Sequence, residues 1–270
     1  MLGKLIKYEF KATAKAFGLL FGALIVMTLL TRFCVWIPFD NMIFEILNTL
    51  MTILYFILVF GLVMFSIVIV IMRFNRSMLR DEGYLTHTLP ATKWQLLVAK
   101  GITYIVWIVA SLIMMLVSMY LFFVGTKDFD VFKNLFNKFM DNVNMKLLLL
   151  LIVVAIVQII ANLYNFFAAL SLGQMFAKHK IAGAVLFYFI LNYAMSFLTS
   201  GMLLLLPKSV VDVKAIEAKI ETAKTFGDTI AAMDNLIYLL LIIALVADII
   251  LTVVYFAISN YVLSKKLNLE

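Results

Sequence analysis

Residues 50–72, LMTILYFILVFGLVMFSIVIVIM, form a long apolar run with no charged side chain and no proline. A helix needs about 20 such residues to cross the hydrocarbon core of a bilayer. The run is apolar on every face, whereas a strand of a membrane barrel alternates apolar and polar residues. The stretch therefore predicts a transmembrane helix.

The rest of the chain repeats this pattern. Of the 270 residues, 65% are hydrophobic and 14% are charged, and the mean hydropathy is +1.10. A soluble domain has about half apolar and about a quarter charged residues, so lipid is the expected solvent. We expect an all-α polytopic membrane protein, a single transmembrane domain over residues 1–270. Its six predicted spans are residues 17–37, 50–72, 102–124, 147–170, 181–206 and 236–258.

The basic residues orient the spans, because Lys and Arg favour the cytoplasmic side of a membrane. With the N-terminus inside, the short segments on that side are nearly all basic, and the opposite side carries most of the acids. We therefore expect both termini in the cytoplasm and a multi-pass protein of the plasma membrane. A net charge of +7 could indicate binding to nucleic acid. Because the basic residues are explained here by the orientation of the spans, we expect no nucleic-acid partner.

The segment before the first span, LGKLIKYEFKATAKAF, predicts a basic amphipathic helix. Four lysines share one helical stripe: Lys4, Lys7, Lys11 and Lys15. Four apolar residues share the opposite stripe: Leu2, Ile6, Phe10 and Phe17. Such a helix lies in the headgroup layer of the inner leaflet. A plain basic anchor for the first span is the alternative.

Two longer loops are expected on the outer side. Residues 125–146 have mixed charges and several Phe. Residues 207–235, the extracellular loop, have a charged stripe typical of a helix. This second loop is interpreted either as a cap over an outer vestibule or as a solvated helical loop.

The sequence lacks the motifs of several enzyme classes. It has no GxxxxGK[ST] loop to hold phosphates and no HExxH zinc motif. His87 and His179 fall in predicted loops, and Cys34 is the single cysteine. We expect no catalytic, cofactor-binding or metal-binding residue, and hence no enzyme activity in this chain.

Polar residues within the last three spans suggest a translocation path. Asp248 lies near the middle of the sixth span, where an ionisable group costs about 2.5–3.5 kcal/mol to insert. The candidate path residues are Asn162, Asn165, Asn192 and Asp248. The alternative for the amides is hydrogen bonding between helices, worth about 0.6 kcal/mol per contact. A lone acid also suits proton coupling in a secondary transporter.

Residues 73–100, RFNRSMLRDEGYLTHTLPATKWQLLVAK, are the substantial polar segment on the inner side. Arg73, Arg76 and Arg80 share a helical face, so the second span is expected to continue past the apolar run. Gly83 can end that helix, and Pro90 favours a new helix start. Thr92 and Gln95 then fit a capping box ahead of the third span. Such a segment is either a docking surface for a cytoplasmic partner or an ordinary loop between spans.

This segment resembles the inner loop between spans two and three of type-2 ATP-binding cassette (ABC) exporter permeases. The matching residues are Glu82, Gly83, Leu85, Leu89, Pro90, Thr92 and Lys100. In the family the glycine is typically followed by Thr-Leu-Glu, whereas this chain has Tyr-Leu-Thr at 84–86. That departure resembles small permeases of Gram-positive bacteria, whose N-terminal sequence is also similar to KLIKYEFKA. The resemblance extends to the layout of six spans.

The resemblance implies a transmembrane subunit that pairs with a second copy or a sister permease. Two separate ABC ATPase subunits would bind ATP and Mg²⁺ and contact a coupling helix in the loop at residues 73–100. The residues implied in that contact are Glu82, Gly83, Tyr84, Leu85 and Pro90. The small bacterial members imply a peptide or a hydrophobic compound as substrate. An ion-coupled secondary transporter using Asp248 and a non-transporting scaffold or immunity protein remain as alternatives.

Overall fold

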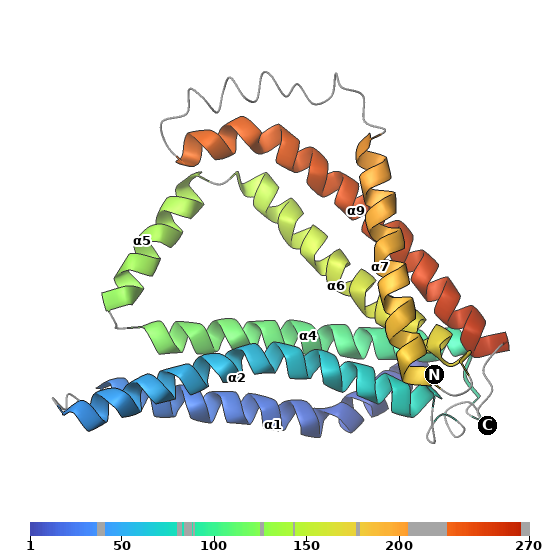
Figure 1. The fold of residues 1–270 in the computed structure, drawn as a ribbon, viewed down its shortest axis with the longest axis horizontal. Coiled ribbons are helices and arrows are strands. Elements are labelled where there is room, and N and C mark those ends of the chain that lie inside the picture. Colours follow the sequence, from blue (N-terminus) through green and yellow to red (C-terminus); the bar gives the residue numbers. More distant parts are fainter. Residues whose placement is uncertain are drawn as a thin grey trace. The chain divides into compact units, whose positions relative to one another are not determined.

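The computed structural model describes residues 1–36, 41–79, 83, 88, 90–124, 127–142, 144–176, 179–204 and 226–265. Within these ranges every regular element is a helix, and no strand occurs. The helices are α1 (Leu2–Trp36), α2 (Met42–Phe74) with its π-helical continuation η1 (Asn75–Leu79), α4 (Lys93–Phe123), α5 (Lys127–Asn142), α6 (Met145–Gly173), α7 (Lys180–Leu204) and α9 (Phe226–Lys265) (Figure 1).

Six helices in the described part of the chain are long and apolar enough to cross a membrane. They cover Leu2–Cys34, Met42–Leu79, Lys93–Phe123, Met145–Gly173, Lys180–Gly201 and Leu236–Lys265. Many of their large apolar side chains are exposed, including Phe60 and Phe197. Exposed apolar surface on this scale suits a helix bundle surrounded by lipid. The predicted all-α fold with six spanning helices is therefore confirmed.

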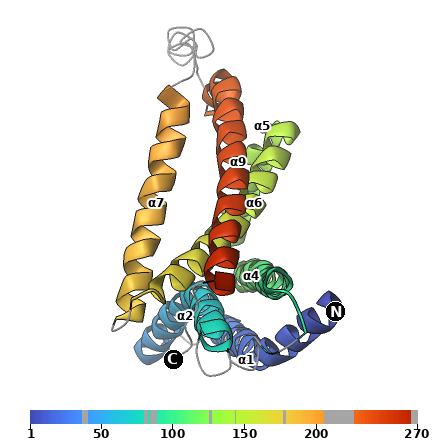
Figure 2. The same cartoon turned by 90° about the vertical axis from the view of Figure 1, so that its right-hand side faces the viewer.

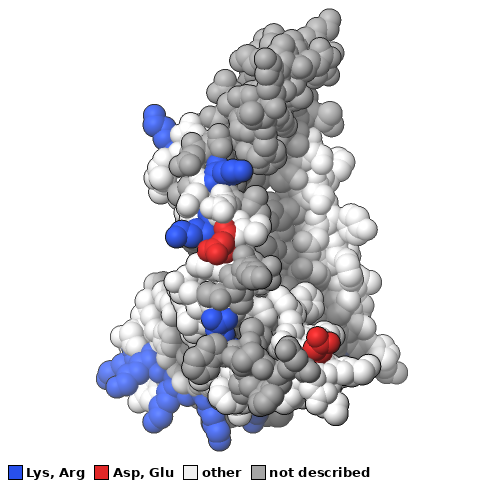
Figure 3. Space-filling model, turned by 90° about the vertical axis from the view of Figure 1, so that its left-hand side faces the viewer, with Lys and Arg blue, Asp and Glu red and all other residues white. Residues whose placement is uncertain are grey.

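The basic N-terminal segment is continuous with the first span. It forms the beginning of α1, a helix of 35 residues, and its four lysines are exposed. Figure 2 shows that this part turns away from the axis of the remaining helix. In the space-filling view, basic side chains gather in one patch at the lower left (Figure 3).

The two expected outer loops contain helical structure. Residues 127–142, expected as part of a loop, form α5. In the second expected loop, α9 begins at Phe226, and the charged stripe from Lys214 to Lys224 lies outside the described residues, so the helix expected there stays a prediction.

The contacts divide the chain into two compact units, Met1–Phe132 and Lys133–Asn268. In the first unit α1, α2 and α4 run side by side (Figure 1). Its core contains Leu24, Tyr55, Val59 and Leu62. The Tyr55 ring stacks on Phe122 with 4.6 Å between centroids, which joins α2 to α4.

In the second unit α6 packs against both α7 and α9. The Phe166 and Tyr188 rings stack at 4.8 Å, and Tyr164 meets Phe256 edge-on at 5.5 Å. α6 and α7 approach closely where α6 ends and α7 begins. A Cβ atom added to Gly173 would lie 2.5 Å from the backbone nitrogen of Ala184, so this crossing requires glycine.

Candidate functional site at the start of α4

The second spanning helix continues into the polar segment 73–100, as predicted. After Phe74 the helix widens into the π-helical turn η1, in which Ser77, Met78 and Leu79 are buried. Such π-helical turns are rare and often occur at functional sites. This turn carries the Ser77 side chain toward α1 and α4.

The structure describes part of the region between η1 and α4. Gly83 is helical and buried, and because its neighbours on both sides lie outside the described residues, the helix break expected at this glycine stays a prediction. Pro90 lies in an exposed bend. The other three predicted contact residues, Glu82, Tyr84 and Leu85, lie outside the described residues.

The start of α4 has the predicted capping interaction. The backbone N–H of Thr92 donates to Oε1 of Gln95 at 3.3 Å, and the helix begins at Lys93. This contact pairs a donor near the helix N-terminus that has no partner within the helix. The end of the loop at residues 73–100 is therefore held in place as it enters α4.

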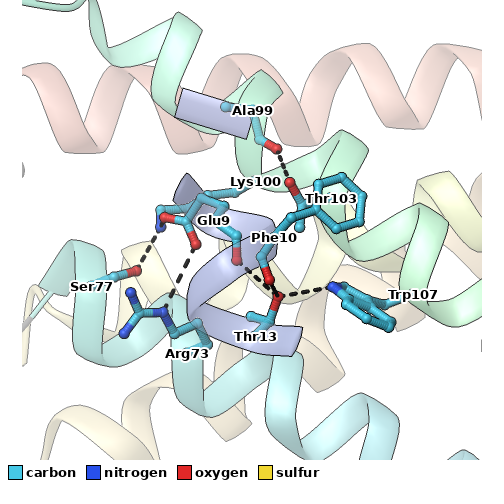
Figure 4. Close-up of polar contacts among 9 residues, drawn as sticks. All are labelled: Glu9, Phe10, Thr13, Arg73, Ser77, Ala99, Lys100, Thr103 and Trp107. Carbon is cyan, nitrogen blue, oxygen red and sulfur yellow. Dashed lines mark hydrogen bonds and ion pairs between the residues drawn. The ribbon is translucent and has the colours of Figure 1, made fainter. Parts of the chain in front are cut away.

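The buried side chain of Lys100 lies beside Ser77, which is also buried, and Glu9, which is partly exposed (Figure 4). The Lys100 side chain is 1% exposed, forms an ion pair with the Glu9 carboxylate and donates to Oγ of Ser77 at 2.7 Å. The other Glu9 oxygen lies 3.8 Å from Nε of Arg73. We call Glu9, Arg73, Ser77 and Lys100 the ion-pair cluster.

The cluster joins three helices, because Glu9 belongs to α1, Arg73 and Ser77 to the end of α2 and η1, and Lys100 to α4. Removing a charge from water costs several kcal/mol unless a partner of opposite sign compensates it. The Glu9 carboxylate compensates the charge of Lys100 at this buried position. Both ends of the predicted loop are thus held by Glu9 of α1. Arg73 at the start of the loop and Lys100 at its end each pair with this carboxylate.

A small pocket borders the cluster. Its volume is about 290 Å³, and its lining combines charged and apolar side chains. The lining residues are Leu5, Tyr8, Glu9, Arg73, Leu96, Ala99 and Lys100.

Further hydrogen bonds fix α4 to α1. The indole N–H of Trp107 donates to Oγ1 of Thr13 at 2.8 Å, and its ring stacks on Phe17 at 4.5 Å. Near the opposite end, Ser118 and Thr28 share a hydrogen bond of 2.9 Å. Arg32 also donates to the backbone carbonyl of Val124, just beyond the last residue of α4.

The same face of α4 also bonds to α2. Ser111 shares a hydrogen bond of 2.9 Å with Ser66, and Ser118 shares one of 2.8 Å with Tyr55. In lipid, helices associate through packing and such polar contacts rather than through the hydrophobic effect. We call Trp107, Ser111 and Ser118 the polar face of α4. Contacts along the helix make α1, α2 and α4 one connected unit.

The four candidate path residues belong to the second unit. Asp248 and Asn165 are each 1% exposed. Among the described residues, Oδ2 of Asp248 and the side-chain amide of Asn165 have no hydrogen-bond partner. Asn162 donates to the carbonyl of Gln158 at 2.9 Å within its own helix. Asn192 does the same to Tyr188 at 2.8 Å.

Asn165 and Asp248 lie at different levels of the second unit. Asn165 follows Tyr164, whose ring contacts Phe256. Asp248 lies two helical turns before Phe256, or about 12 Å along α9. The structure therefore presents these two buried polar residues separately, rather than as one site.

Sequence reasoning missed Glu9 and the polar face of α4. Glu9 is the single acid before Asp40, and its position in the helix is on the Leu2 side, opposite the lysines. An acid on the apolar stripe of a helix indicates a buried cationic partner. This position of Glu9 was the feature of the sequence from which its pairing could have been predicted. The spacing of Trp107, Ser111 and Ser118 at four and seven positions was also readable as one helical face.

These features define a class: an all-helical membrane protein whose first three spanning helices are joined by a buried ion-pair cluster and a polar face. Among the described residues, no group of three or more His, Cys, Asp or Glu is placed to hold a metal ion. No family model, curated protein or solved structure matches the chain.

Proposed function

We propose that this chain is the transmembrane permease subunit of an ABC exporter, working with separate ATPase subunits. The observation that carries the proposal is the ion-pair cluster at the two ends of the loop that resembles a coupling segment. Ser77 lies near the start of the loop at residues 73–100 and Lys100 is its last residue, and these two side chains are hydrogen-bonded at 2.7 Å. Six apolar helices supply the membrane-spanning part.

In this proposal the cluster transmits force. ATP and Mg²⁺ bind to the partner ATPases, whose closure displaces the loop between η1 and α4. Because both ends of the loop are bonded to α1 through Glu9 and Lys100, a push on the loop moves α1, α2 and α4 together. A second permease copy or a sister permease would form the other half of the path.

The substrate path is assigned to polar residues of the later helices, with Asp248 as the main candidate. A peptide or hydrophobic compound is the proposed substrate. The site of action is the plasma membrane of a bacterial cell, with both termini in the cytoplasm.

An ion-coupled secondary transporter is the second candidate, and one observation favours it. Asp248 is buried within a spanning helix, and its Oδ2 has no hydrogen-bond partner among the described residues. A carboxyl in that setting is suited to exchanging a proton during a transport cycle.

The test begins with purification of the tagged chain from its native membrane. The proposal expects a P-loop ATPase to copurify and to hydrolyse ATP in the complex. Pro90→Ala and Glu82→Ala should weaken the association or uncouple ATP hydrolysis from transport. Lys15→Gln, a change at an exposed lysine of α1, is the matched control and should do neither.

Two results would contradict the proposal. Transport by the purified chain alone, driven by an ion gradient in liposomes, would favour the secondary transporter. A complex that contains no ATPase and transports nothing would favour a scaffold or immunity protein.

A further inference from the structure

Helix α5 is amphipathic, although it lies between two membrane-spanning helices. Its sequence, KDFDVFKNLFNKFMDN, has large apolar residues at positions 129, 132, 135, 136, 139 and 140. Spacings of three and four positions put these residues on one side of a helix. The charged residues and Asn occupy mainly the other side, together with the exposed Val131. The helix thus has one apolar and one polar face.

Two residues of the apolar face have described side chains, and they differ in exposure. Phe136 is 51% exposed, although it lies near the middle of that face. Phe129, nearer the start of the helix, is half-buried and meets the Tyr120 ring of α4 edge-on at 5.7 Å. On the polar side Asp130, Asn134 and Asn137 are exposed, as expected for residues in water.

The connections of α5 keep it at the membrane surface. Three residues separate the end of α4 at Phe123 from Lys127, and two separate Asn142 from the start of α6 at Met145. Each linker residue spans at most about 3.6 Å. The apolar sequence of α4 continues to its last residue, so this end lies at the edge of the hydrocarbon layer. Both ends of α5 are therefore held within about 15 Å of spanning helices.

The charges of α5 identify what kind of surface the helix fits. The sequence contains three Lys and three Asp, so the helix has no net charge. Interfacial helices that depend on anionic lipid carry an excess of Lys and Arg on the polar face. An uncharged helix with several Phe relies instead on burying its apolar face among lipid chains.

We propose that α5 lies along the membrane surface, with the Phe136 side of the helix in the boundary between headgroups and acyl chains. The lipid that it contacts belongs to the leaflet reached by the end of α4 and the start of α6. The binding does not require anionic headgroups. The helix acts as an interfacial anchor between the third and fourth spans, independently of what the protein transports.

The test measures the depth of single fluorescent labels. The single native cysteine is first removed by Cys34→Ser. Phe136→Cys and Asn134→Cys then place the same environment-sensitive fluorophore on opposite sides of α5. The full chain is reconstituted into neutral phosphatidylcholine vesicles, with and without lipids that carry a shallow nitroxide quencher.

The label at 136 should emit at shorter wavelength than the label at 134 and be quenched by the nitroxide lipid. The label at 134 should show neither effect. Adding anionic phosphatidylglycerol should leave both signals unchanged. A second pair, Phe129→Cys and Asp130→Cys, gives the same comparison if the first pair does not fold, as judged by helix content.

Three outcomes would overturn the proposal. Equal, water-like emission at 136 and 134 would show that the apolar face does not enter the membrane. A blue-shifted but unquenched label at 136 would show that protein rather than lipid covers the face. Quenching at 136 that appears only with anionic lipid would show that charge, rather than the apolar face, holds the helix.

Discussion

Replacing Glu9 by Gln should destabilise the protein far more than removing an exposed charge from the same helix. The change keeps the size of the side chain and removes the negative charge that faces Lys100. Lys100 is 1% exposed, so it cannot recover the lost interaction by turning into water. Breaking a buried ion pair by removing one partner costs about 3–5 kcal/mol, because the other charge stays buried alone.

The expected loss is therefore about 3–5 kcal/mol in the free energy of unfolding. For a chain of this size that corresponds to a fall in Tm on the order of 10 °C. Thermal unfolding of the purified protein in a mild detergent, followed by helix content, measures it. Lys15→Gln is the control, since changes at exposed positions stay within about 0.5 kcal/mol.

A double-mutant cycle identifies the interaction responsible. Lys100→Gln alone should also destabilise, whereas Glu9→Gln with Lys100→Gln should recover part of the loss. The coupling energy should be about 2–3 kcal/mol. A loss below about 1 kcal/mol for Glu9→Gln, or additive effects in the cycle, would refute the reasoning. The pair would then behave as a solvated surface pair.

Three further outcomes are expected. Gly173→Ala should cost about 1–3 kcal/mol of unfolding free energy, because its Cβ would overlap the start of α7, whereas Gly18→Ala has open space and should be neutral or stabilising. A stable Gly173→Ala protein in the same unfolding assay would contradict the close crossing. Ser118→Ala should lower the free energy of unfolding by about 1–2 kcal/mol, since it removes the hydrogen-bond partner of the Thr28 and Tyr55 hydroxyls. No measurable change would mean that water replaces the Ser118 hydroxyl. Asp248→Asn should leave copurification with an ATPase intact and weaken ATP-driven transport, because Asp248 is the main candidate for the substrate path; loss of the ATPase from the purified complex would contradict this assignment.

The spanning helices could be predicted from hydropathy because each contains an apolar run long enough to cross a bilayer. Hydropathy alone did not give their ends, because helices continue into polar sequence; the continuation of the second helix was predicted instead from the shared helical face of Arg73, Arg76 and Arg80. The second helix extends to Leu79 since η1 packs against the ion-pair cluster. The first begins at Leu2, where no drop in helix propensity separates the basic segment from the span. α5 was missed for a different reason: its high polarity suggested a loop, although its apolar spacing is helical.

The candidate site was predictable only in part. The capping box at Thr92 depends on residues three positions apart, so it was visible in the sequence and is confirmed. The pairing of Glu9 with Lys100 joins residues 91 positions apart, and no local pattern specifies it. The contact residues Glu82, Tyr84 and Leu85 stay predictions.

The ion-pair cluster also sets an order for biogenesis. A membrane protein enters the bilayer from its N-terminus as it is synthesised, so Glu9 is made long before Lys100. Until the third helix emerges, Arg73 is the one cation of the cluster available to this carboxylate. Arrival of Lys100 supplies the second cation at the moment when α4 inserts. The ion-pair cluster is thus complete only after the third helix has been synthesised.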